Sequence, residues 1–120
     1  MDYGRISGNV TSKWLEIFRI VYVSLHSSNP DVDDPIFSEI TGAGYRRLRM
    51  SMDIVSDRSV VNTTSIKFTN LPNTLVTHIG LWSTEINGDL LASAPMENPL
   101  RVTTGASLQF IPSTIAVSLS

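Results

Sequence analysis

The segment from Leu75 to Ala92, LVTHIGLWSTEINGDLLA, contains the clearest indication of secondary structure in this sequence. Its first part, up to Ser83, is rich in apolar and β-branched residues, which is typical of a strand. Asn87-Gly88-Asp89 follows, and Asn and Gly tolerate the positive φ angles that a tight connection requires. The chain then returns through Leu90-Leu91-Ala92. We therefore predict an antiparallel hairpin here.

The rest of the chain repeats this pattern of short apolar runs separated by turns. Ile20 to His26 predicts a buried strand, and Tyr45 to Met52 alternates like a strand with one exposed face. A polar loop, Asp31 to Gly44, separates the two. Further strands are predicted over Val60–Thr69, Leu100–Thr103, Ala106–Ile111 and Thr114–Leu119, with a kinked link bounded by Pro95 and Pro99 and a turn at Thr104-Gly105.

The composition also favours strands over helices. Serine and threonine together number 27 of 120 residues, against only two lysines and four glutamates, which normally fill exposed helix faces. Seven or eight short strands joined by tight turns fold most economically into two packed sheets. We predict an all-β fold, a small antiparallel β-sandwich, with a closed β-barrel as the alternative that the sequence does not separate from it.

The N-terminus is expected to differ from the rest of the chain. Residues 1–10 have no periodic apolar pattern and are predicted to form an extended arm, without the order of regions that a signal peptide has. Residues 11–120 form the predicted domain. It begins with a short helix over Lys13–Arg19, where apolar residues including Trp14 have helical spacing.

Charge, hydropathy and cysteine content exclude several classes of protein. The net charge is -2, so the electrostatic attraction that non-specific nucleic-acid binding needs is missing. No apolar run approaches the roughly 18 residues of a membrane helix, so no membrane partner is expected. With no cysteine in the sequence, a disulfide scaffold, a thiolate zinc site and a cysteine nucleophile are all excluded.

No motif in the sequence indicates catalysis, a metal site or a cofactor site. A G-x-S-x-G elbow is absent, and His26 and His78 are interpreted as structural imidazoles with a ligand or pH-sensing role as the alternative. Asp31, Asp33 and Asp34 lack the ligand spacing of a calcium loop. We therefore expect no enzyme activity, no bound metal and no cofactor.

The basic cluster Arg46, Arg47 and Arg49 has two interpretations. Charged residues on an exposed strand protect it against aggregation, whereas arginines at an interface pair with acidic residues of a neighbouring protein. Trp14 is similarly either a core anchor or a residue that faces a partner. Trp82 is interpreted as a core anchor.

Three blocks of sequence together resemble a family of small virion structural proteins of tailed bacteriophages. Val21–Pro30 resembles the family pattern YxxLHTxxP, and Glu39–Arg47 resembles E-x-x-G-x-x-Y-x-R. Ile79-Gly80-Leu81-Trp82 followed by Gly88–Ala92 resembles an IGLW strand and a G-x-L-L-A hairpin. The closing pair is Gly105–Phe110 and Ile115–Leu119.

The resemblance implies a structural role in the virion, with assembly in the host cytoplasm. The first expectation is a capsid cement or decoration protein that stabilises the major capsid lattice. A tail or fibre-associated protein is the alternative, and a host-surface carbohydrate-binding module that uses aromatics such as Tyr3, Tyr22 or Tyr45 is another. The expected partners are the major capsid protein or other virion proteins. The chain is also expected to form a homo-oligomer, for which the resemblance suggests a trimer. The residues predicted at partner interfaces are Tyr3, Arg5, Trp14, Asp31, Asp33, Asp34, Arg46, Arg47 and Arg49.

Overall fold

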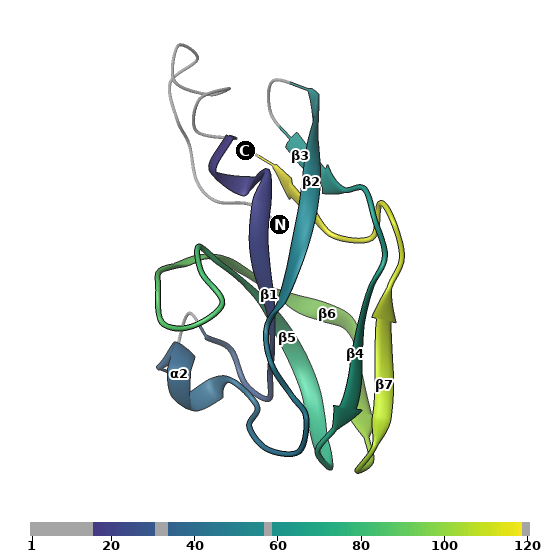
Figure 1. Ribbon diagram of the computed structural model, residues 1–120. Helices are drawn as coiled ribbons and strands as arrows, with labels where there is room; N and C mark the ends of the chain where they lie inside the picture. The colour runs from purple at the N-terminus through teal and green to yellow at the C-terminus, as the bar shows by residue number, and fades with distance from the viewer. Residues whose placement is uncertain (1–15, 31–33, 57–58, 119–120) are drawn as a thin grey trace.

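The computed structural model describes residues 16–30, 34–56 and 59–118 (Figure 1). The predicted all-β, antiparallel character is confirmed, because the described elements are strands apart from two single-turn helices. In chain order they are η1 (Glu16–Phe18), β1 (Ile20–His26), α2 (Pro35–Ser38), β2 (Leu48–Ser56), β3 (Ser59–Asn62), β4 (Ile66–Leu71), β5 (Thr74–Trp82), β6 (Leu90–Val102), β7 (Ala106–Phe110) and β8 (Ala116–Ser118).

Six of the strands form one curved sheet in the order β6-β5-β1-β2-β3-β8, and β4 and β7 form a separate ribbon. Every pairing is antiparallel. The two outer strands, β6 and β8, border the same cavity of about 500 Å³, together with Phe110 of β7. The six-stranded sheet thus curls until its edges approach each other, which is closer to an incompletely closed barrel than to two equal sheets.

One apolar core fills the space between the curved sheet and the β4–β7 ribbon. The alternating residues Val21, Val23 and Leu25 of β1 point into it, and Phe68 of β4 closes it from the ribbon side. The other face of β1 is also buried, because Ser24 and His26 have no exposed surface. A strand buried on both faces needs a second cover, and α2 and the loop between β5 and β6 lie on that side of the molecule (Figure 1).

The predicted strand over Val60–Thr69 is wrong as a single element. Its first part belongs to β3, which pairs with β2 and β8, whereas its second part belongs to β4, which pairs with β7. The chain therefore leaves the six-stranded sheet between Asn62 and Ile66. The propensity for β-strand is high throughout Val60–Thr69, so the sequence gives no sign that the run divides into two strands. Only the pairing partners show the division.

The predicted kinked link between Pro95 and Pro99 lies inside the 13-residue strand β6, and it coincides with a break in the pairing, since His78 pairs with Pro95 and Val76 with Leu100. β6 is at the edge of its sheet, where one side of the backbone needs no partner, and proline is tolerated there. A register shift between Val76 and His78 of the neighbouring strand accommodates the irregularity.

The predicted N-terminal helix and polar loop are only partly described. Within the described residues, the helix is reduced to the single 3-10 turn η1, because β1 begins at Ile20. The arm 1–10, Trp14 and the first aspartates of the loop lie outside the described residues. The remainder of the loop is more ordered than predicted: it forms α2, and Glu39 then makes a β-bridge with His26.

Candidate functional site

Polar side chains gather on the outer face of the six-stranded sheet, opposite the apolar core. They come from β1, α2, the segment before β2, and the end of β5. We call this group the polar cluster, and its members are Ser24, His26, Ser38, Glu39, Tyr45, Arg47 and Trp82. The first two blocks of the sequence resemblance, with the IGLW-like strand, supply all of its members except Ser38, which directly precedes the second block.

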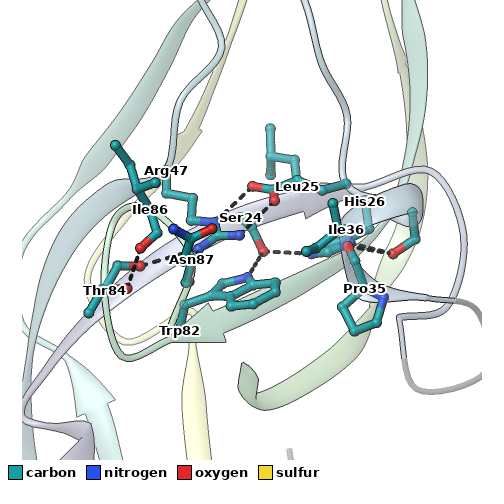
Figure 2. Close-up of polar contacts among 12 residues, drawn as sticks. Ser24, Leu25, His26, Pro35, Ile36, Arg47, Trp82, Thr84, Ile86 and Asn87 are labelled. Carbon is teal, nitrogen blue, oxygen red and sulfur yellow. Dashed lines mark hydrogen bonds and ion pairs between the residues drawn. The ribbon is translucent and has the colours of Figure 1, made fainter. Parts of the chain in front are cut away.

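A directed chain of hydrogen bonds passes through His26 (Figure 2). Trp82 Nε1 can only donate, so it donates to Ser24 Oγ at 2.7 Å and leaves the serine hydrogen for His26 Nε2 at 2.6 Å. On the other side, Ser38 Oγ donates to the Pro35 carbonyl at 3.1 Å and therefore accepts from His26 Nδ1 at 2.8 Å. These directions require a neutral imidazole with its hydrogen on Nδ1.

Protonation of His26 is disfavoured in this position. Burial is the largest cause, and it lowers the pKa of His26 from 6.5 to about 4, against an opposing effect of Glu39 and with smaller lowering effects of Arg47 and His78. A protonated ring would also donate from Nε2, so the Ser24 hydroxyl hydrogen would lose its acceptor. His26 is thus a structural imidazole that joins β1 to α2.

We expect the free energy of unfolding to fall as the pH is lowered from about 6.5 towards 4. In this interval the unfolded chain binds a proton at His26 that the folded chain does not bind. The contribution of neutral His26 to stability is therefore fully present above pH 6.5, its pKa in the unfolded chain, and is lost as the pH falls towards 4, its pKa in the folded chain. The full loss is on the order of 3 kcal/mol, of which more than half falls between pH 7 and 5. Urea unfolding measured between pH 7 and 5 checks it.

The matched control replaces the second histidine. His26→Gln should remove this part of the pH dependence, whereas His78→Gln keeps His26 and should retain the slope. Equal slopes for the wild type and His26→Gln would contradict the assignment of the slope to His26.

Arg47 is the centre of the second half of the polar cluster. Arg47 is buried, with 8% of the residue exposed. Its guanidinium forms a bidentate pair with Glu39, from Nε to Oε2 at 3.0 Å and from Nη2 to Oε1 at 2.9 Å. The guanidinium carbon lies 3.6 Å from the centroid of the Trp82 ring. Such a planar, stacked and bidentate arrangement is one that lysine cannot reproduce.

The same guanidinium also holds the loop between β5 and β6. Arg47 Nη1 donates to the carbonyl of Asn87 at 2.8 Å and to that of Thr84 at 3.3 Å, as Figure 2 shows. Within the loop, Thr84 Oγ1 donates to the Ile86 carbonyl at 2.8 Å. Asn87 and Gly88 have the predicted positive φ angles, but the connection from Trp82 to Leu90 is a longer loop than the predicted tight turn.

Tyr45 closes the cluster on the side of the core. Its hydroxyl donates to Glu39 Oε2 at 2.6 Å and accepts from the Leu25 amide at 3.0 Å, while its ring stacks on Phe68. Burial, followed by the hydrogen bond to Glu39, raises the pKa of Tyr45 far above its ordinary value. The hydroxyl therefore stays protonated and joins the loop to β1.

The polar cluster joins strands and loops through its hydrogen bonds. Ser24 and His26 have the separation of a nucleophile and its base, but neither has exposed surface, and Ser24 Oγ is already occupied by Trp82. The described residues contain no group of three or more potential metal ligands. None of the helices in that part of the chain is long and apolar enough to cross a lipid bilayer.

Two segments that the polar cluster holds in place carry exposed apolar side chains. Ile36 and Phe37 of α2 are 65% and 87% exposed, and Ile86 of the β5–β6 loop is 75% exposed. Arg46 and Glu85, both exposed, line a cavity of about 380 Å³ beside Glu39 and Arg47. We call these five residues, Ile36, Phe37, Arg46, Glu85 and Ile86, the α2–loop surface.

The residues predicted at interfaces are separated by the structure. Arg46 and Arg49 are exposed. Arg47, which directly precedes β2, is buried, because its guanidinium pairs with Glu39 and stacks on the ring of Trp82. The Asp34 carboxylate caps α2 by accepting from the Ile36 amide at 2.9 Å. Tyr3, Arg5, Trp14, Asp31 and Asp33 lie outside the described residues.

Sequence reasoning missed the acid that pairs with Arg47. Glu39 and Arg47 have opposite charges on either side of the Gly42–Gly44 turn, and the E-x-x-G-x-x-Y-x-R pattern contains both together with Tyr45. That spacing was the available signal. Trp82 is buried as predicted, but it is also a hydrogen-bond donor and a face for a cation.

Comparison with known proteins identifies a family for this chain. A family model described as "Podophage GP4 fiber I protein gp80" matches residues 19–118, which include both halves of the polar cluster and the α2–loop surface. No curated protein matches the chain. The match supports the predicted tailed-phage structural protein and favours the fibre alternative over capsid decoration, which it does not support.

Proposed function

The chain belongs to the family of podophage GP4 fiber I protein gp80, and from this premise we propose that it is a structural component of a phage tail or tail fibre. The family match over residues 19–118 is the observation that carries the proposal. Capsid decoration, our first expectation from the sequence, has no such support.

The chemistry of the described residues is in accord with a structural role without catalysis. The hydroxyl, imidazole and carboxylate groups of the polar cluster are engaged with one another, so their effect is to fix strands and loops. A protein that acts by being present in a virion needs a stable surface for its neighbours and no activated nucleophile.

The surface we assign to neighbouring virion subunits is the α2–loop surface. This surface consists of exposed apolar side chains on two segments, and the guanidinium of Arg47 holds both segments in place. Such side chains provide contact area, and little conformational entropy is lost when a partner binds. Arg49 and the residues of the N-terminal arm, Tyr3 and Arg5, remain predicted interface residues.

The copy number per virion tests the proposed location. A tail or fibre component should be present in at most a few dozen copies per particle by quantitative mass spectrometry, and a label on it should be found at the tail in electron micrographs. Hundreds of copies spread over the head would contradict the proposal and would favour a capsid decoration protein instead. A glycan array tests the carbohydrate-binding alternative separately.

A further inference from the structure

Asn87 and Gly88 form the single Asn-Gly pair of the sequence, and both residues are exposed in the β5–β6 loop. An asparagine before a glycine is prone to lose its side-chain amide, because the backbone nitrogen of the next residue can attack the side-chain carbonyl carbon. Glycine has no Cβ atom, so no side chain shields the attacking nitrogen. The two reacting groups belong to adjacent residues, so the attack is intramolecular. The turn thus contains the atoms for a reaction of its own.

Both reacting groups of this pair are available. In the part of the chain that the structure describes, no group accepts a hydrogen bond from the Gly88 amide, and the side-chain amide of Asn87 forms no hydrogen bond. The loop around them is nevertheless fixed. Ser83 donates from its amide to the Asp89 carbonyl at 3.0 Å, and its hydroxyl accepts from the Asp89 amide at 3.0 Å. The nitrogen and the carbon that must meet are therefore free within a loop whose base is closed.

The backbone carbonyl between the two reacting groups is hydrogen-bonded to a cation. Arg47 Nη1 donates to the Asn87 carbonyl oxygen at 2.8 Å (Figure 2). When the Gly88 amide loses its hydrogen to become the nucleophile, resonance across the peptide bond spreads the negative charge onto that same oxygen. A guanidinium at this position stabilises the developing charge more than it stabilises the neutral amide. Arg47 is thus placed to make the Gly88 amide more acidic and its attack faster.

We propose that Asn87 is a site of spontaneous deamidation and that the guanidinium of Arg47 promotes the reaction. The Gly88 nitrogen forms a bond to Asn87 Cγ and gives up its hydrogen as a proton. The bond from Cγ to the side-chain nitrogen breaks, and ammonia leaves with a proton in place of that bond. Water then opens the five-membered imide at either of its two carbonyls, which leaves aspartate or isoaspartate at position 87.

The isoaspartate product changes the contact between the loop and Arg47. In this product the main chain runs through the former side chain and is longer by a single carbon. The carbonyl that Arg47 holds becomes a free carboxylate, which competes with Glu39 for the guanidinium. Glu85 and Ile86 directly precede Asn87 in the loop. The reaction therefore alters one of the two segments of the α2–loop surface as the protein ages.

Peptide mass spectrometry of the purified full chain, incubated for several weeks at mildly alkaline pH, tests the site. Deamidation at Asn87 should be faster by about 10-fold or more than at the other asparagines of the described residues, since none of these precedes glycine. They are Asn29, Asn62, Asn70, Asn73 and Asn98, of which the first and the last precede proline. Fragmentation should locate isoaspartate at position 87. An Asn87 that stays intact, or an earlier reaction at another asparagine, would overturn the proposal.

Removal of the guanidinium tests the part assigned to Arg47. Arg47→Met should slow deamidation at Asn87 by about 10-fold, the effect expected for loss of one charge-assisted hydrogen bond to the developing charge. The matched control Arg49→Met removes an exposed arginine and should leave the rate unchanged. An unchanged or faster reaction in Arg47→Met, or an equal loss in Arg49→Met, would contradict promotion by Arg47.

A second measurement does not depend on the folding of Arg47→Met, which loses the partner of Glu39 and is checked by circular dichroism. The wild type is incubated at the same pH both folded and in concentrated urea, where Arg47 no longer lies at the Asn87 carbonyl. The folded chain should deamidate at Asn87 about 10-fold faster than the unfolded chain. A slower reaction in the folded chain would mean that the fold protects Asn87, and the role proposed for Arg47 would be wrong.

Discussion

Replacement of Arg47 by methionine should lower the free energy of unfolding by about 3–5 kcal/mol, the cost of leaving a buried acid without its partner. The Glu39 side chain is 12% exposed and receives two of its hydrogen bonds from Arg47. The substitution also frees the carbonyls of Thr84 and Asn87. Urea unfolding at neutral pH measures the change.

A double-mutant cycle separates the ion pair from the other contacts of Arg47. Glu39→Gln combined with Arg47→Met removes both charges, so the double variant should be more stable than the sum of the single losses predicts. Arg49→Met is the matched control, because Arg49 is exposed, and it should change stability by no more than about 0.5 kcal/mol. A loss below about 1 kcal/mol for Arg47→Met would contradict a central role of the pair.

Replacement of Gly80 by alanine should destabilise the chain by about 3 kcal/mol, through overpacking and a broken hydrogen-bond chain. Gly80 of β5 lies directly opposite Ser24 of β1 in the sheet. A Cβ atom built at Gly80 would lie 2.5 Å from Ser24 Oγ and 2.8 Å from His26 Nε2. Both atoms are buried and hydrogen-bonded, so neither can move without losing a partner.

Gly44→Ala is the control for the general effect of adding a methyl group. The nearest atoms there belong to the exposed Asn70, with Nδ2 at 2.8 Å and Cβ at 3.1 Å. The amide end of that side chain can move away, so we expect a smaller loss than at Gly80. Ser24→Ala combined with Gly80→Ala should be less destabilised than the sum of the two, since the closest atom is gone. Additive losses, or equal losses for Gly44→Ala and Gly80→Ala in thermal unfolding, would exclude the close contact as the cause.

The polar cluster gives a physical reason for the conspicuous motifs of this sequence. Gly80 leaves room for Ser24 and His26, Trp82 starts the hydrogen-bond chain, and Glu39 pairs with Arg47. These residues belong to segments far apart in the chain. Together they fasten α2 and the β5–β6 loop to the sheet, and the exposed α2–loop surface depends on that attachment.

Features that depend on local conformational preferences could be predicted from the amino-acid sequence. The strand predicted over Ile20–His26 has the same bounds as β1. A run of β-branched residues that is followed by turn-forming residues shows where the strand ends. Asn87 and Gly88 adopt the positive φ angles expected of them. The all-β class and the antiparallel pairing follow from the same local signals.

The choice of pairing partners, by contrast, depends on contacts between segments that are distant in the sequence. Val60–Thr69 divides between two sheets, and Pro95 and Pro99 remain within a strand, because pairing and edge position override local propensity. Arg47 follows the alternation of an exposed strand in the sequence, yet it is buried, because Glu39, Trp82 and two loop carbonyls surround it in space. The fate of a charged side chain depends on neighbours that are distant in sequence, since only they can compensate its loss of water.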